Sequence, residues 1–418
     1  MIRNYLKVAL KVLARRKFFT FISLFGISLT LLVLMVVTAI FDHALAPHAP
    51  ETRSDRTLGI YQLSMRGPNV SMNTEPGYGF LHRYVRPLAA LPEVERVAIV
   101  SLARPVVSYL GGRKIESTLR RTDGEFWQVL DFQFLEGGPF TAEDERNARF
   151  VAVISETTRQ RFFGGKPALG RTLEADGQRF RIVGVVPDVP VLRFSSAADL
   201  WVPISTAKSQ SYQDRWMGDF IALILARSRA DLPAVKAEFE ARRREAERHL
   251  PDPKTFKTLV GSADTLFEGA VHRFGPGDSV QVQPGRVRAT LFLLMLLFML
   301  LPTLNLVNIN LSRILDRASE IGVRKAFGAS SRTLVGQFVV ENVVLTLIGA
   351  AVGLVLAGLV LGALNASGVI AYAHLNLNYR IFLYGLALAL FFGVLSGVYP
   401  AWRMSKLHPV QALRGRPA

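Results

Sequence analysis

The 418-residue chain contains no cysteine. This absence excludes a disulfide framework, a cysteine zinc site, an iron–sulfur cluster and a catalytic thiol. The seven histidines are scattered, and no H-E-x-x-H pair occurs, so the sequence predicts no metal site. There is no G-x-x-x-x-G-K-[ST] motif, because Gly165-Lys166 is followed by Pro167. These residues therefore form no P-loop for nucleotide hydrolysis.

One weak catalytic pattern is present. Ser205 and Lys208 fit S-x-x-K, but neither S-D-N nor K-T-G occurs anywhere in the sequence. A pattern with only two fixed positions arises easily by chance. We therefore predict no catalytic residues and no enzymatic activity in this chain, and we keep a membrane-anchored enzyme only as an alternative.

Acidic residues are also scarce, with 33 Asp and Glu against 50 Lys and Arg, a net charge of +17. Half of the residues are apolar and mean hydropathy is +0.26. A helix that crosses a bilayer needs about 20 mostly apolar residues. The sequence offers four such segments, which predict four transmembrane helices: Phe18–Ile40, Ala289–Leu311, Thr333–Leu364 and Ile381–Trp402.

The positions of the basic residues predict the topology. Residues 1–17, 312–332 and 403–418 carry charges of +6, +3 and +4, which is +13 of the total +17. Cytoplasmic flanks are enriched in Lys and Arg, so both termini and the middle loop are predicted to be cytoplasmic. Residues 43–285 hold 32 basic and 29 acidic residues and must then lie outside. No basic block remains there to bind nucleic acid.

The first apolar segment could instead be a cleaved signal peptide. It follows a basic stretch, and Ala44-Leu45-Ala46 resembles a cleavage site. Signal peptides have apolar regions of only about 7–15 residues, however, and this one is far longer. We therefore expect an uncleaved anchor.

The predicted organisation is a helical membrane protein with one large extracytoplasmic α/β domain. We expect strands at Thr57–Met65, Val94–Ser101 and Phe220–Ala226, with helices at Tyr78–Leu91 and Asp231–Leu250. Short β runs predict a β-rich insert at roughly residues 105–215. The predicted divisions are an amphipathic cytoplasmic helix at 1–17, transmembrane helices at 18–42, 286–311, 333–364 and 381–402, the outer domain at 43–285, a cytoplasmic segment at 312–332, a short outer loop at 365–380 and a cytoplasmic tail at 403–418.

Polar residues and glycines within the apolar segments are candidate functional positions. Glu341 is the carboxylate deepest in a predicted span, and Asn305 and Asn308 lie one turn apart in another. Ionisable groups in membranes usually face a protein interior, although Glu341 could also reach headgroup water. Three G-x-x-x-G pairs permit close helix packing: Gly349 with Gly353, Gly358 with Gly362, and Gly393 with Gly397.

The polar segment between the second and third spans resembles a known family. The run Glu320–Ala329 (EIGVRKAFGA), followed by Gln337-Phe338 and Glu341, is similar to the signature of MacB/FtsX-like ABC transporter permeases. Gly397–Ala401 and Pro409–Arg414 resemble the C-terminal pattern of that family. Phe162-Phe163-Gly164, Gly170 and Phe180–Val186 resemble its periplasmic core domain, more loosely.

The resemblance implies a mechanotransmission permease in the bacterial inner membrane. It implies that the outer domain divides into an α/β Porter-like part and an inserted β-rich Sabre-like part. It also implies that no cofactor binds this chain and that a cytoplasmic ABC ATPase dimer, encoded separately, binds ATP and Mg. The residues that would lie in or beside the ATPase contact are Glu320, Ile321, Gly322, Arg324, Lys325 and Gly328.

The resemblance leaves the partner and the task open. The second permease subunit would be another copy of this chain or a homologue. The leading expectation is export of a substrate together with a periplasmic adaptor and an outer-membrane channel. Lipoprotein extraction and FtsX-like signalling are the alternatives within the family. The large outer domain favours export over signalling.

Overall fold

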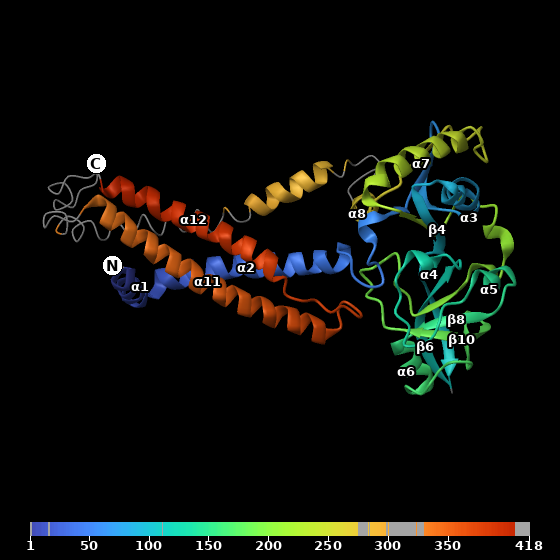
Figure 1. The fold of residues 1–418 in the computed structure, drawn as a ribbon, viewed down its shortest axis with the longest axis horizontal. Coiled ribbons are helices and arrows are strands. Elements are labelled where there is room, and N and C mark those ends of the chain that lie inside the picture. Colours follow the sequence, from blue (N-terminus) through green and yellow to red (C-terminus); the bar gives the residue numbers. More distant parts are fainter. Residues whose placement is uncertain are drawn as a thin grey trace. The chain divides into compact units, whose positions relative to one another are not determined.

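The structure is a computed structural model that describes residues 2–15, 17–110, 112–274, 283, 285–297, 300, 323 and 330–405. Internal contacts divide the chain into two units. The helical unit comprises Met1–Asp42, Arg288–Val369 and His374–Ala418. The α/β unit comprises His43–Val287 and, from a distant part of the sequence, Ile370–Ala373. Figure 1 shows the helices of the first unit and the sheet of the second.

The helical unit is built from long helices. Two of them, Lys17–Leu45 and the Val335–Ser367 stretch, are long and apolar enough to cross a membrane, and Tyr379–Leu395 is a shorter apolar helix. The predicted span at 286–311 lies partly outside the described residues, so four spans remain a prediction. The helices are α1 (Ile2–Arg15), α2 (Lys17–Leu45), a helical stretch at 285–297, α11 (Ser331–Ser367) and α12 (Tyr379–Ser405).

Local sequence sets the ends of α11. Ser330 is the N-cap, and its Oγ accepts a hydrogen bond of 3.2 Å from the Thr333 backbone N–H. Gly368 ends the helix at φ +64°, a left-handed conformation that costs glycine nothing because it has no Cβ. Leucines, valines and alanines predominate among the 37 residues between, and α11 packs against both α1 and α12.

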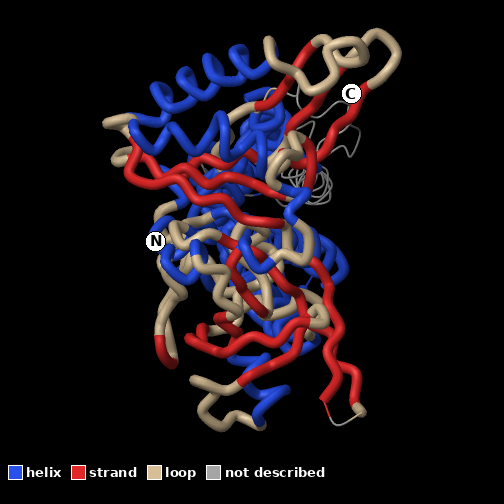
Figure 2. The backbone as a smooth tube through the Cα atoms, turned by 90° about the vertical axis from the view of Figure 1, so that its right-hand side faces the viewer, coloured by secondary structure: helices blue, strands red, loops and turns tan. Residues whose placement is uncertain are grey.

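The α/β unit contains two sheets. The ten-stranded sheet has the order β1 (Thr57–Ile60), β13 (Phe220–Ala226), β4 (Val94–Ser101), β6 (Arg113–Thr122), β11 (Leu200–Pro203), β8 (Val151–Ser155), β10 (Gln178–Val186), β7 (Glu136–Gly137), with β5 (Arg104–Leu110) on β6 and β9 (Thr172–Ala175) on β10. The four-stranded sheet has the order β12 (Met217–Gly218), β3 (Ser71–Pro76), β2 (Leu63–Arg66), β14 (Thr258–Gly261). The pairs β8–β10 and β6–β11 are parallel and the other pairs are antiparallel. Figure 2 shows these strands in red.

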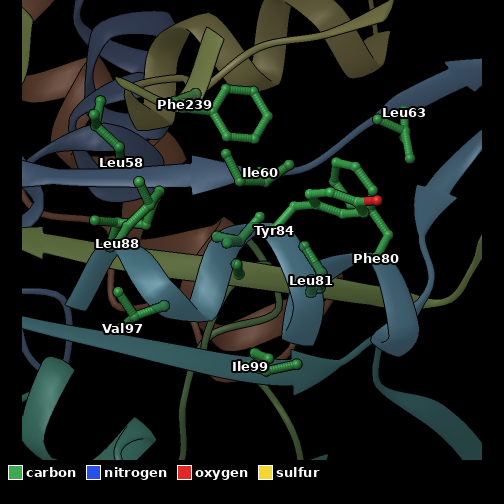
Figure 3. Close-up of a cluster of buried hydrophobic side chains, with 14 of the residues drawn as sticks. Leu58, Ile60, Leu63, Phe80, Leu81, Tyr84, Leu88, Val97, Ile99 and Phe239 are labelled. Atoms are coloured by element: carbon green, nitrogen blue, oxygen red, sulfur yellow. The ribbon is translucent and has the colours of Figure 1, made fainter. Parts of the chain in front are cut away.

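Short helices and turns connect the strands. They are η1 (Ser54–Arg56), α3 (Tyr78–Phe80), η2 (Leu81–Val85), η3 (Arg86–Ala90), α4 (Phe126–Val129), α5 (Ala142–Arg146), α6 (Glu156–Phe163), η4 (Ile204–Thr206), η5 (Gln210–Tyr212), η6 (Arg229–Asp231), α7 (Leu232–Glu247) and α8 (Leu266–Phe274). One hydrophobic core is formed by side chains of β1 and β4 together with those of α3, η2, η3 and α7 (Figure 3). Ile60 of β1 and Phe239 of α7 are both almost fully buried in it. The core therefore holds α7 against the sheet.

Two sequence predictions for this unit were wrong in detail. The expected strand Thr57–Met65 is two strands, β1 and β2, which belong to different sheets. The expected helix Tyr78–Leu91 is three short segments, and Pro87 lies in the last of them. Proline cannot donate a backbone hydrogen bond, which disfavours a regular helix there. The predicted strands Val94–Ser101 and Phe220–Ala226 were confirmed with the same bounds.

The predicted insert shares the large sheet with the rest of the unit. Strands β4 and β6 meet through one register pair, Val100 with Thr122. The next residue, Asp123, is buried and accepts hydrogen bonds from Arg86 Nη1 at 2.6 Å and the Ile99 N–H at 2.8 Å. Burial raises the pKa of Asp123 to about 7, although Arg86 acts in the opposite direction. This carboxyl joins η3, β4 and β6.

Candidate functional site

The predicted ATPase contact lies outside the described residues. This applies to Glu320, Ile321, Gly322, Arg324, Lys325 and Gly328. It also applies to Asn305 and Asn308 in the second predicted span. Their roles stay predictions from the sequence.

Glu341 is described, and it is buried within α11 at 3% exposure. The side-chain amide of Gln337, one turn earlier, donates a 3.1 Å hydrogen bond to Glu341 Oε1. Asn342 and Thr346 on the same helix are buried as well. These buried polar side chains mark a side of α11 that faces protein, because lipid would offer such groups no partners.

The glycine pairs differ in their surroundings. A Cβ on Gly353 would lie 2.9 Å from the Ser28 carbonyl oxygen of α2, and one on Gly349 would lie 2.9 Å from Ile27 Cγ2. A Cβ on Gly393 of α12 would lie 2.7 Å from Thr346 Oγ1 of α11. Gly397 also lies in α12. Gly349 and Gly353 therefore let α11 approach α2 closely.

A buried ionic cluster lies in the α/β unit, beside the residues where the chain leaves α2. Arg193 and Glu51 are 1% and 4% exposed, and Arg193 Nη1 lies 3.3 Å from Glu51 Oε2. Ser196 Oγ donates to the other carboxylate oxygen at 2.7 Å. Arg193 Nη2 donates to the carbonyl oxygens of His43 at 2.9 Å and Ala46 at 3.1 Å. The guanidinium therefore binds both the carboxylate and the C-terminal end of α2.

Arg193 belongs to the segment between β10 and β11, residues 187–199, which we name the anchor loop. The guanidinium of Arg120 on β6 donates 2.7 Å hydrogen bonds to the carbonyls of Ser195 and Phe194. Trp201 Nε1 on β11 donates to the Ser196 carbonyl at 3.1 Å. Two sheet side chains, both at most 2% exposed, thus hold the loop in one conformation.

The anchor loop also binds the distant segment Ile370–Ala373. The Val191 N–H donates to the Ala371 carbonyl at 3.4 Å, and Tyr372 Oη donates to Asp199 Oδ1 at 3.3 Å. The other carboxylate oxygen of Asp199 accepts from the Thr118 N–H at 2.7 Å. Tyr372 has a φ of +60°, a left-handed conformation that is uncommon in residues other than glycine.

Burial dominates the electrostatics of the cluster. It raises the pKa of Glu51, and the Ser196 hydroxyl and the Arg193 guanidinium oppose that shift. Burial likewise raises the pKa of Tyr61. The centroid of its ring lies 5.0 Å from the centroid of the Phe194 ring in the anchor loop. Glu51, Tyr61 and Ser195 line a small cavity, and the hydroxyl of Ser195 opposes the shift in the pKa of Tyr61.

A second cavity, of about 200 Å³, lies between α7 and α8. His272 Nδ1 is 2.7 Å from Asp264 Oδ2, and Ser262 Oγ is 3.5 Å from the same nitrogen. A catalytic triad needs the serine and the carboxylate on opposite ring nitrogens, so this is no triad. Lys208, of the S-x-x-K pattern, is ion-paired with Asp176 at 2.8 Å. In the described ranges no cluster of three or more His, Cys, Asp or Glu could hold a metal.

Sequence reasoning missed the anchor loop. Arg193 and Glu51 are 142 positions apart, and neither belongs to a charge run or a motif. The one local signal was the Pro187–Pro190 segment, which marks a turn after a strand.

The comparisons with known families cover both units. The MacB-like periplasmic core domain matches residues 20–242, and the FtsX-like permease C-terminal domain matches residues 292–409. The chain therefore belongs to the MacB/FtsX-like family of ABC transporter permeases. This family is embedded in membranes and carries a periplasmic domain with an α/β fold, which is the α/β unit here.

Three curated relatives illustrate the range of the family. The macrolide export ATP-binding/permease protein MacB of Bdellovibrio bacteriovorus is 28% identical over 66% of this chain and 41% of its own length. The pyoverdine export ATP-binding/permease protein PvdT of Pseudomonas syringae is 27% identical over 98% of this chain and 59% of its own length. The ABC transporter permease YknZ of Bacillus subtilis is 24% identical over 80% of this chain and 79% of its own length. The chain thus spans about half the length of MacB and PvdT.

Proposed function

We propose that this chain is the permease subunit of a MacB-type ABC transporter. ATP hydrolysis by a cytoplasmic ATPase dimer would move the membrane helices, and these would move the α/β unit so that a substrate is exported across the envelope. The observation that carries the proposal is the order of the two family matches, a periplasmic core domain followed by a permease domain along one chain. MacB and PvdT, two of the relatives, are named for export.

The proposed topology has four membrane spans, with both termini in the cytoplasm and the α/β unit in the periplasm. The charge distribution supports it, since the three predicted cytoplasmic segments carry +13 of the +17. The two candidate spans α2 and α11 contribute the longest apolar helices in the described ranges. The partners would be the ATPase, which binds ATP and Mg, a second permease subunit, and an adaptor with an outer-membrane channel.

Co-purification tests the proposal. The tagged chain is extracted from its native membrane in mild detergent, and the sample is analysed for other proteins and for ATP hydrolysis. We expect a P-loop ATPase at stoichiometric yield, with activity that is lost when its Walker lysine is changed. Recovery of the chain without an ATPase, and without ATP hydrolysis, would contradict the proposal.

A further inference from the structure

We propose that the anchor loop is the element through which the α/β unit is moved, and that Arg193 is the residue that positions it. This inference rests on the proposed function and names the contact that transmits the movement. The loop binds residues from two separate places in the sequence, the end of α2 and the segment between α11 and α12. Within the described residues, both attachments belong to the α/β unit.

The first attachment is the C-terminal end of α2. The last four carbonyls of a helix lack partners within the helix and carry the negative end of its dipole. Arg193 donates to His43, in that last turn, and to Ala46 just beyond it. One cation therefore binds two carbonyl groups, and any displacement of this helix end displaces Arg193.

Glu51 holds the guanidinium in place. It lies six residues beyond the end of α2 and contacts both Arg193 and Ser196 of the anchor loop. Because these side chains are buried, removal of either charge leaves the other without compensation. Breaking such a buried pair is costly in free energy, whereas exposed ion pairs contribute little.

The loop is attached in turn to the large sheet. Arg120 on β6 and Trp201 on β11 bind three consecutive carbonyls of the loop, those of Phe194, Ser195 and Ser196. Strands β6 and β11 are parallel neighbours in the middle of the sheet order. A movement received by Arg193 is therefore passed to the interior of the sheet.

The second attachment is the segment between α11 and α12. Tyr372 binds Asp199 at the other end of the anchor loop, and Asp199 is also bound to Thr118 on β6. The Val191 N–H binds the neighbouring Ala371 carbonyl. Two segments of the α/β unit, one at the end of α2 and one between α11 and α12, thus contact one loop at separate points, so the loop responds to both.

The test uses the natural absence of cysteine, which allows selective labelling. Arg179 is 81% exposed on β10, and a cysteine there carries a spin label. The complex with its ATPase is reconstituted, and the distance between labels on the two permease subunits is measured with and without trapped ATP. If the second subunit is a homologue, its label is placed on the equivalent strand. ATP hydrolysis is measured in parallel.

Two variants test opposite consequences of the proposal. Arg193→Met loosens the attachment, so we expect the ATP-dependent distance change to fall by more than half while ATP hydrolysis is retained. A disulfide between V191C and A371C, formed before labelling, fixes the second attachment; the Val191 nitrogen lies 3.4 Å from the Ala371 carbonyl oxygen. We expect the locked protein to retain the full distance change, because the contact stays closed throughout the cycle.

Arg149→Met is the matched control. It removes one arginine from the same unit, but Arg149 is half exposed and pairs with Glu143 and Asp144 at the surface. We expect it to behave like the unsubstituted chain. If Arg193→Met also keeps the full change, or if the locked protein loses it, the inference is wrong.

Further results separate this inference from the proposed function. If the unsubstituted complex shows no ATP-dependent change, the proposed function fails and the inference fails with it. If Arg193→Met does not assemble, Tyr372→Phe replaces it, because this change removes a single hydroxyl and leaves the buried cluster intact. Tyr372→Phe should then reduce the distance change without affecting ATP hydrolysis. An unaltered change in that variant would overturn the inference.

Discussion

Gly353 in α11 should tolerate alanine poorly, whereas Gly362 nine residues later should tolerate it well. Both glycines belong to G-x-x-x-G pairs on the same helix. The added Cβ at Gly353 would lie 2.9 Å from the Ser28 carbonyl oxygen and 3.2 Å from Leu31 Cβ. At Gly362, no atom in the described part of the chain lies within 4 Å of it.

The size of the difference follows from two opposing effects. Alanine is favoured over glycine in a helix by about 1 kcal/mol, and both variants gain this term. Overpacking a tight contact costs about 1–3 kcal/mol, and only Gly353→Ala incurs it. The obstacle at Gly353 is helix backbone, which cannot rotate away. We therefore expect Gly353→Ala to be less stable than Gly362→Ala by about 1–3 kcal/mol.

Equilibrium unfolding of the purified chain in mixed micelles measures this difference. Gly349→Ala is a useful intermediate case, because its obstacle is the side chain of Ile27, which can shift. We expect its stability to lie between those of the other two variants. If Gly353→Ala is as stable as Gly362→Ala, α11 does not approach α2 as closely as the structure indicates.

Three further predictions concern the rest of the chain. Replacing Glu320 and Arg324 together with alanine should preserve membrane insertion and ATP hydrolysis but reduce the ATP-dependent distance change by more than half; a double variant with the full change would show that the ATPase contact lies elsewhere. The pKa of Asp123 is raised to about 7 from an ordinary value of 3.8, so its contribution to stability is complete below pH 4 and is lost as the pH rises through 7. Asp123→Asn should flatten that part of the profile of melting temperature against pH, and an unchanged slope would assign it to other groups. Phe239→Ala should cost about 3–5 kcal/mol in the unfolding free energy, since the ring is 1% exposed, whereas Phe150→Ala, at 46% exposure, should cost much less; equal losses would contradict the described core.

Several elements could be predicted from the sequence because their signals are local. β4 and β13 are runs of β-branched and apolar residues between turn residues, and their bounds were predicted correctly. The long apolar helices follow from length and composition alone, and the run Glu320–Ala329 identifies the family by resemblance. Each of these patterns can be read within one continuous stretch of the sequence.

Other features depended on which segments meet in space. Gly349, Gly353, Gly358 and Gly362 follow the same pattern, yet only the first two face α2 at close range among the described residues. Thr57–Met65 has one continuous strand pattern, but the chain passes from one sheet to the other at Tyr61 and Gln62. The sequence contains no signal for either difference, because both depend on neighbours that are remote along the chain.

The ionic cluster depended entirely on tertiary structure. The residues Glu51, Arg120, Arg193 and Tyr372 come from four distant parts of the sequence, and each one resembles an ordinary surface residue there. Only the folded chain removes the first three from water, and a buried charge needs a partner that an exposed charge does not. The sequence determined the family, the apolar helices and many of the strands, since these follow from local composition and pattern. Tertiary structure decided which charged side chains form the buried contact between the anchor loop and the end of α2. The cost of burying a charge arises only when distant segments together exclude water from it.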